Sequence, residues 1–183
     1  MKSEAVQSFE GFIKGDLAES IVSRPFRRLG YHVRYNGVEV THPDLLLFTQ
    51  MNLIGKEKTL HLAYQPDFLV TRIKSERYSE GLNLPVEVKY RKSGKISSRE
   101  LQPYADNVQF VFLDCQSFWS LPKAQLGTAM ENTQSTIFFS ALTPLECDKT
   151  FNFSEEEKQL IISYKACVKV IDNISINSDA GLP

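Results

Sequence analysis

The sequence has little cysteine and little histidine, and both shortages narrow the kinds of site it can carry. The three cysteines are odd in number and form no Cys-x-x-Cys pair. They are Cys115, Cys147 and Cys167. A disulfide framework and a cysteine-based zinc site are therefore not expected, and a reduced intracellular (cytoplasmic) compartment is favoured. The three histidines show no spacing typical of metal ligands.

Long hydrophobic runs are also missing. The longest apolar stretches, such as residues 136–142, are far too short to span a bilayer, and the polar start MKSEAVQSFEGF has no apolar core of a secretory signal. A composition of 42% hydrophobic and 23% charged residues is ordinary for a globular protein. The 183 residues therefore predict one soluble domain of α/β (α+β) type over residues 1–173, with no membrane association and a disordered tail over 174–183.

A strong overall charge is absent as well, because the formal net charge is −1. The distribution is uneven: residues 1–100 carry 16 Lys and Arg against 12 Asp and Glu, and residues 101–183 carry 5 against 10. One basic group lies within residues 89–99 and an earlier one within residues 24–34. Such groups are typical either of a solvated surface or of a phosphate-contacting patch.

The first helical pattern covers residues 16–29. Asp16 after Gly15 is a good N-cap, Gly30 is a good stop, and Pro25 is expected to kink the helix or restart it. A stripe at helical spacing predicts the buried face: Ala18, Val22, Phe26 and Leu29. A second, earlier helical segment is expected over residues 3–14.

Strand patterns occupy the middle of the chain. Two alternating runs flank Asn36-Gly37, a hairpin signal, and residues 59–64 alternate as a strand. Residues 67–73 and 84–90 are expected to pair antiparallel, and residues 108–114 predict a buried strand. Ser97 and Glu100 have capping-box spacing for a short helix. Residues 115–135 are expected to form loop or short helix, residues 137–142 a strand, and residues from Ser154 onward a capped helix.

Two of these strands carry acids that packing does not call for. Asp67 follows Pro66 at the start of one strand, and Glu87 lies between Val86 and Val88 in the next, with Lys89 two residues later. Because side chains alternate along a strand, Glu87 and Lys89 share one face and the valines share the other. Antiparallel pairing could bring Asp67 beside Glu87. Two such carboxylates repel each other unless a positive group or a cation lies between them.

This order resembles the PD-(D/E)XK nuclease superfamily, which includes many restriction endonucleases, Holliday-junction resolvases and repair nucleases. The matching pieces are Pro66-Asp67, Glu87-Val88-Lys89 and a preceding helix with Glu19, whose context GDLAESIVSRPFRRLGYHV is similar to the resolvase-type branch. One branch of the superfamily carries Gln-x-x-x-Tyr on the following helix; here Gln102-Pro103-Tyr104 has a different spacing.

The resemblance implies a restriction-endonuclease-like αβββαβ core over residues 16–114, with a mixed central sheet and an added C-terminal helix in the extension over 115–173. It implies that Asp67, Glu87 and Glu19 bind Mg²⁺ (or Mn²⁺), and that Lys89 is the catalytic lysine. Hard oxygen ligands and a divalent cation suit phosphodiester hydrolysis by an endonuclease. Gln65 and Gln102 are candidates for supporting the site.

Each acid also has a simpler interpretation. Glu19 stands three residues after Asp16, where a capping box favours glutamate, and Glu87 with Lys89 could be an exposed cross-strand ion pair. Asp67 could be a turn acid. A second proline–acid pair, Pro43-Asp44, precedes three leucines and is an alternative to Asp67.

DNA is the expected partner. The basic residues just past the Glu-x-Lys strand are the candidates for contacts with backbone phosphates: Arg91, Lys92, Lys95 and Arg99. RNA cleavage and a non-catalytic nucleic-acid- or protein-binding module remain alternatives. A homodimer, or a protein partner on the acidic C-terminal part, is compatible with the sequence.

Overall fold

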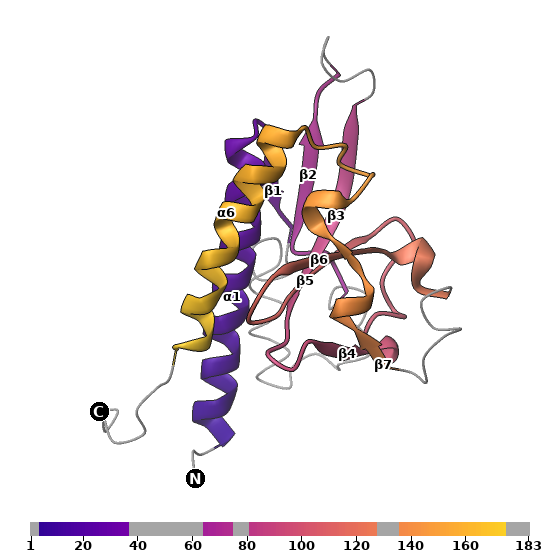
Figure 1. Ribbon diagram of the computed structural model, residues 1–183. Coiled ribbons are helices and arrows are strands. Elements are labelled where there is room, and N and C mark those ends of the chain that lie inside the picture. Colours follow the sequence, from indigo (N-terminus) through magenta and orange to yellow (C-terminus); the bar gives the residue numbers. More distant parts are fainter. Residues whose placement is uncertain (1–3, 37–63, 75–80, 128–135, 175–183) are drawn as a thin grey trace.

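A computed structural model describes residues 4–36, 64–74, 81–127 and 136–174, with side chains from residue 10 onward. The first element of the described residues is helix α1 (Glu4–Arg28), and the last is helix α6 (Glu155–Asp172). Between these two helices the described residues contain strands and short 3-10 helices (Figure 1). The predicted mixed α+β architecture with a C-terminal helix is confirmed.

Helix α1 is longer than the sequence pattern indicates. It runs without a break through Gly15 and Asp16, so Asp16 is not its N-cap and Glu19 is not at a helix start. The predicted stripe is correct for Ala18, Val22 and Phe26, which are at most 1% exposed. Its fourth member, Leu29, lies just past the helix and is partly buried against the same core. The helix ends as expected at Gly30, whose φ of +83° suits glycine and whose N–H donates to the Arg27 carbonyl.

Six strands form the main sheet in the order β1-β2-β3-β5-β6-β8. Their bounds are β1 His32–Tyr35, β2 Phe68–Arg72, β3 Leu82–Tyr90, β5 Gln109–Leu113, β6 Phe118–Pro122 and β8 Thr143–Pro144. β2 and β3 pair antiparallel, as predicted, and β3 and β5 pair parallel. The segment between β3 and β5 holds β4 (Lys95–Ser97) and a 3-10 helix, Ser98–Glu100. The predicted short helix with a capping box of Ser97 and Glu100 is confirmed, whereas the α-helix that the αβββαβ core implies at this place is not formed.

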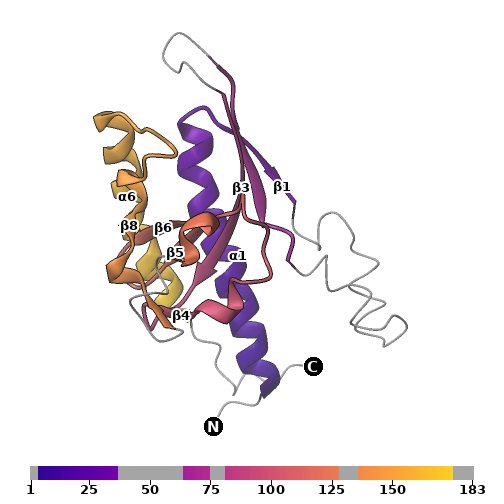
Figure 2. The same ribbon diagram turned by 90° about the vertical axis from the view of Figure 1, so that its right-hand side faces the viewer.

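The sheet has a different hydrophobic core on each face. On one face α1 and α6 pack side by side against residues such as Val86, Val88 and Val111 (Figures 1 and 2). On the other face the second core includes Phe110 and Phe112, with residues from β4 and from β7 (Thr136–Phe138), which form a separate two-stranded sheet. Glu87 and Lys89 pair with Phe110 and Phe112 in the parallel register and therefore belong to this second face.

The C-terminal part departs from the sequence pattern at two points. Residues 118–122, expected as loop or short helix, form β6, whose residue Pro122 ends the strand opposite Gln109. The predicted strand over 137–142 is limited to β7 and continues as a 3-10 helix, Phe139–Ala141. The capping box at Ser154 is confirmed, because its hydroxyl accepts from the Glu157 N–H and the Glu157 carboxylate accepts in return.

No helix in the described ranges is long and apolar enough to cross a membrane. Several predictions fall outside those ranges: the hairpin after Asn36, the alternative acid Asp44, the C-terminal tail from residue 175, and the strand over 59–64 except for Tyr64, which lies in a turn.

Candidate functional site

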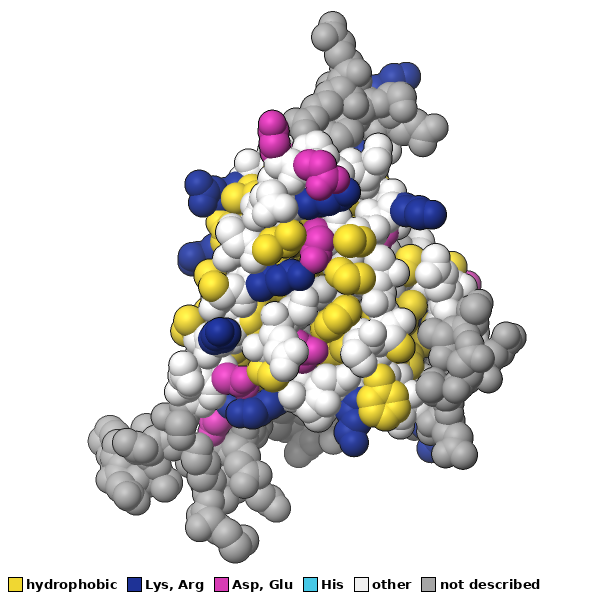
Figure 3. Space-filling view, in the orientation of Figure 1, with side chains coloured by type: hydrophobic (Ala, Val, Ile, Leu, Met, Phe, Trp, Pro, Cys, Tyr) yellow, Lys and Arg dark blue, Asp and Glu magenta, His cyan; other side chains and the backbone are white. Residues whose placement is uncertain are grey.

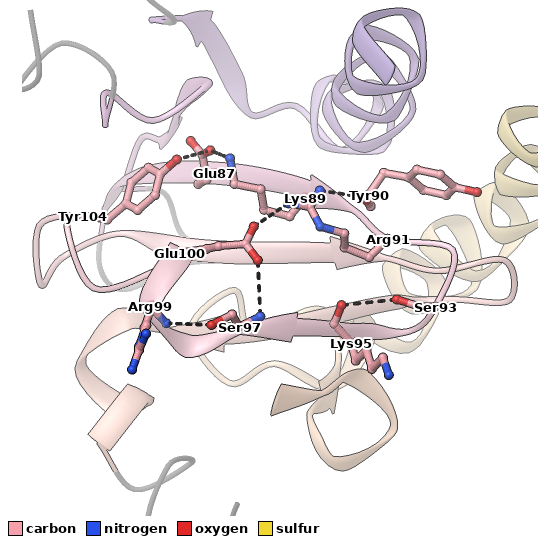
Figure 4. Close-up of polar contacts among 10 residues, drawn as sticks. All are labelled: Glu87, Lys89, Tyr90, Arg91, Ser93, Lys95, Ser97, Arg99, Glu100 and Tyr104. Carbon is pink, nitrogen blue, oxygen red and sulfur yellow. Dashed lines mark hydrogen bonds and ion pairs between the residues drawn. The ribbon is translucent and has the colours of Figure 1, made fainter. Parts of the chain in front are cut away.

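Glu87 is buried in the middle of the sheet with its charge only partly matched. Its side chain is 3% exposed, and its Oε1 atom receives both the Lys89 ammonium and the Tyr104 hydroxyl, the latter at 2.6 Å (Figure 4). Its Oε2 atom is buried and has no hydrogen-bond partner in the described part of the chain. An exposed cross-strand ion pair is therefore excluded, and one buried carboxylate oxygen is left for a further positive group.

Asp67 lies beside Glu87, as antiparallel pairing predicts. Phe68 pairs with Val86 in the antiparallel register. Asp67, which precedes Phe68, therefore lies opposite Glu87, which follows Val86. Asp67 precedes the first residue of β2, and its side chain continues the contact with β3: the Asp67 Oδ2 atom accepts a hydrogen bond from the Val88 N–H at 2.6 Å. The Asp67 carboxylate is thus fixed by the strand that carries Glu87, and it is not a turn acid directed into solvent.

The charges around Asp67 oppose its ionisation. Burial, then the charges of Glu87 and Glu19, raise the pKa of Asp67 to about 9, although the Val88 N–H and the Lys89 ammonium favour the charged form. Glu19 is partly buried on α1, in the interior of the helix. Two acids distant in sequence, Glu87 and Glu19, are thus both within electrostatic reach of Asp67, and their charges disfavour its ionised form.

Tyr104 is the main residue of this site that the sequence analysis did not include. Its side chain is 6% exposed, and its ring lies 5.5 Å from the Lys89 ammonium and packs edge-on against the Tyr64 ring. The hydroxyl donates to Glu87, and burial together with the Glu87 charge raises the pKa of Tyr104 above its ordinary value. The only signal in the sequence was its place in the incomplete Gln-Pro-Tyr motif.

The predicted phosphate-contacting residues lie beyond the end of β3. Arg91 donates to Glu100 at 2.6 Å, and Lys92 lies 3.4 Å from Asp172, so both have acidic partners within the chain. Lys95 and Arg99 are exposed, and Figure 4 shows their side chains extending away from the Glu87–Lys89 pair. These residues can form a basic border to the site, but they are not part of its centre.

The two predicted supporting glutamines differ in position. Gln65 is partly buried two residues before Asp67. Gln102 is exposed and lines a separate open cavity of about 450 Å³ with Asp106 and Lys123. Tyr104, two residues later, makes the contact with Glu87 instead. A supporting role for either glutamine stays a prediction.

The oxygen atoms of Asp67 and Glu87 suit a hard divalent cation. Mg²⁺ in proteins often binds one or two carboxylates and completes its coordination with water and substrate phosphate. The unpartnered Glu87 Oε2 atom and the mutual repulsion of the carboxylates fit this requirement. Across residues 4–36, 64–74, 81–127 and 136–174, no three His, Cys, Asp or Glu side chains form a cluster that could hold an ion. Direct ligation by Glu19 therefore stays a prediction.

Tyr104→Phe tests the hydrogen bond to Glu87 directly. We expect the variant to lose about 1–2 kcal/mol of unfolding free energy, because a hydrogen bond to a buried carboxylate is removed and the ring remains. Urea unfolding measures this, with Tyr164→Phe on α6 as the control for a tyrosine outside the site. Equal stability of Tyr104→Phe and the control would contradict the role assigned to the hydroxyl.

No family model matches the chain, and no curated protein or solved structure is significantly similar to it. The PD-(D/E)XK resemblance of the motifs therefore stays a prediction from the sequence.

Proposed function

We propose that the chain is an endonuclease that hydrolyses phosphodiester bonds, with DNA as its substrate, at a Mg²⁺ or Mn²⁺ ion bound by Asp67 and Glu87. One observation carries the proposal: a buried glutamate with one unpartnered oxygen lies between an aspartate that resists ionisation and a lysine. A cation between the two carboxylates would relieve their repulsion. When bound, it would also polarise a phosphoryl oxygen toward nucleophilic attack.

The side chains of the site have separable tasks. Lys89 holds Glu87 in place and presents an ammonium group beside the position where charge develops on the phosphate. Tyr104 occupies the same Glu87 oxygen as Lys89, which leaves Oε2 directed elsewhere. The Val88 N–H fixes one Asp67 oxygen. Glu19 adds negative potential that favours cation binding.

A second candidate is a nucleic-acid- or protein-binding module without catalytic activity. The observation that favours its protein-binding form is the pairing of Arg91 with Glu100 and of Lys92 with Asp172, because these acids weaken the positive potential next to the site. Such a module would need no divalent cation.

Calorimetric titration with Mn²⁺ and a cleavage assay separate the two candidates. The wild-type chain is expected to bind Mn²⁺ and Asp67→Asn is not, because the amide oxygen is a weaker ligand and carries no charge. The wild-type chain should cut plasmid DNA in Mg²⁺ or Mn²⁺ and not in a chelator. RNA of matched length is assayed alongside, since RNA is the alternative substrate.

The result that overturns the proposal is a wild-type protein that binds no Mn²⁺ and cuts neither polymer. Binding of DNA without cleavage under the same conditions would establish the non-catalytic module. Cleavage of RNA in preference to DNA would keep the assigned chemistry and change the substrate.

A further inference from the structure

A second cavity lies beyond the end of β3, outside the carboxylate site. It encloses about 250 Å³, and the loops that follow the parallel strands β3 and β5 form its walls. The loop after β3 is held to its neighbours by backbone hydrogen bonds, from Arg91 N–H to the Leu113 carbonyl and from Phe139 N–H to the Gly94 carbonyl. Gly94 has a φ of +63°, so the turn needs glycine. The cavity is thus built from fixed backbone.

An exposed phenylalanine borders this cavity. Phe138 on β7 is 49% exposed, although its neighbours Ile137 and Phe139 are at most 3% exposed. The exposed ring is not needed for the core, because Phe139 supplies the ring that stacks on Phe112 at 4.8 Å. The open face of an aromatic ring beside a cavity suits a planar partner.

Two lysines flank the phenylalanine. Lys95 is the direct cross-strand partner of Phe138 in the β4–β7 pair, so their side chains are neighbours on one face. Lys92 lines the cavity, and its side chain is 71% exposed despite its contact with Asp172. Figure 3 shows hydrophobic and Lys or Arg side chains next to each other over β4 and β7.

Apart from Gly94 and Cys115, the remaining described lining residues are polar and mostly neutral. Ser93, Gln116 and Ser140 provide hydroxyl and amide groups. The one acid, Asp114, has both oxygens occupied: Oδ1 accepts from the backbone N–H groups of residues 116 and 117, and Oδ2 accepts from the Trp119 indole N–H at 2.9 Å. Its carboxylate therefore has a structural task, and both of its oxygens already accept hydrogen bonds from within the chain.

We propose that this cavity binds an unpaired nucleotide of a single-stranded nucleic acid, with its base stacked on Phe138 and adjacent phosphates contacted by Lys92 and Lys95. Stacking on an exposed aromatic residue between cations is the usual way in which proteins hold single strands without sequence preference. The inference deepens the proposed function and rests on its assumption of a nucleic-acid substrate. From Glu87 to Tyr90, where β3 ends next to the cavity, the strand rises about 10 Å. One single-stranded nucleic acid is therefore long enough to reach both the carboxylate site and this cavity.

Binding of a short fluorescent oligothymidylate in a chelating buffer tests the inference, because no cleavage occurs under those conditions. The wild-type chain is expected to bind the single strand more tightly than a duplex of the same length. Phe138→Ala should weaken single-strand binding by about tenfold, because the stacking surface is lost. Phe138→Tyr should restore it, since a tyrosine ring stacks equally well.

Phe12→Ala is the matched control, because Phe12 is an exposed phenylalanine on α1, at 61% exposure, and does not border the cavity. Its binding should equal that of the wild type, and circular dichroism checks that all variants are folded. Unchanged binding by Phe138→Ala, or equal loss in Phe12→Ala, overturns the inference. The outcome does not depend on cleavage. Loss of binding in Phe138→Ala would support this site even if the wild type binds no Mn²⁺ and cuts no DNA. Cation-dependent cleavage with unchanged binding in Phe138→Ala would reject this site and leave the proposed nuclease activity in place.

Discussion

Asp67→Asn and Lys89→Met are both expected to lower the rate of cation-dependent DNA cleavage by about two orders of magnitude or more, while they change stability in opposite directions. Asp67→Asn replaces a buried acid, which the cation-free fold keeps protonated, by a neutral amide and should stabilise the cation-free protein at neutral pH. Lys89→Met leaves Glu87 buried without its counter-charge and should destabilise it by about 3 kcal/mol. Single-turnover cleavage of plasmid DNA and urea unfolding measure the two effects.

Because the two variants change stability in opposite directions, a loss of activity in both cannot be explained by unfolding. A variant that is inactive because it is unfolded cannot also be more stable than the wild type, so Asp67→Asn gives the decisive rate. Lys158→Ala is the control for lysine removal, because Lys158 lies at the start of α6 and contacts Glu155. Full cleavage activity in both Asp67→Asn and Lys89→Met would reject the roles assigned to these residues.

Local patterns predict the central part of this fold well because neighbouring residues decide it. The alternation around Glu87 separates the valines of the helix-side core from Glu87 and Lys89 on the opposite face, as the structure has them. A short connection between two strands enforces antiparallel pairing, and that pairing brings Asp67 beside Glu87. The candidate site therefore follows from a pattern that spans only about two strands.

Features that depend on distant packing were not predictable in this way. Gly15-Asp16 has the composition of a helix boundary, but α1 continues through it because the helix packs along α6 and the sheet, which outweighs a glycine cost of about 1 kcal/mol. Residues 118–122 contain serine and proline, yet they form β6 because β5 offers a buried strand to pair with. Tyr104 reaches Glu87 only through the path of the β3–β5 crossover, which has no periodic signal.

In the absence of divalent cations, the protein is expected to lose stability as the pH rises from about 5 to about 8, and Asp67→Asn should remove most of this dependence. An aspartate has a pKa near 3.9 in an unfolded chain, and the fold raises the pKa of Asp67 to about 9. Between these values the folded state binds one proton more than the unfolded state. The stability gained from that proton is complete below the lower pKa and is lost as the pH rises toward the upper one, with a slope of at most about 1.4 kcal/mol per pH unit.

Urea unfolding of the wild type and Asp67→Asn in a chelating buffer across this pH range gives the slope of unfolding free energy against pH for each protein. The difference between the two slopes isolates the contribution of Asp67 from those of the ionisable groups near it, which include Glu19, Glu87 and Lys89. Addition of Mg²⁺ or Mn²⁺ near the upper end of the range should restore stability to the wild type and leave Asp67→Asn unchanged, because a cation that binds only the folded carboxylates stabilises that state. Parallel pH profiles for the two proteins would show that the fold does not raise the pKa of Asp67, either by burial or by the charges of Glu87 and Glu19. A cation effect of equal size in both would place the binding site elsewhere.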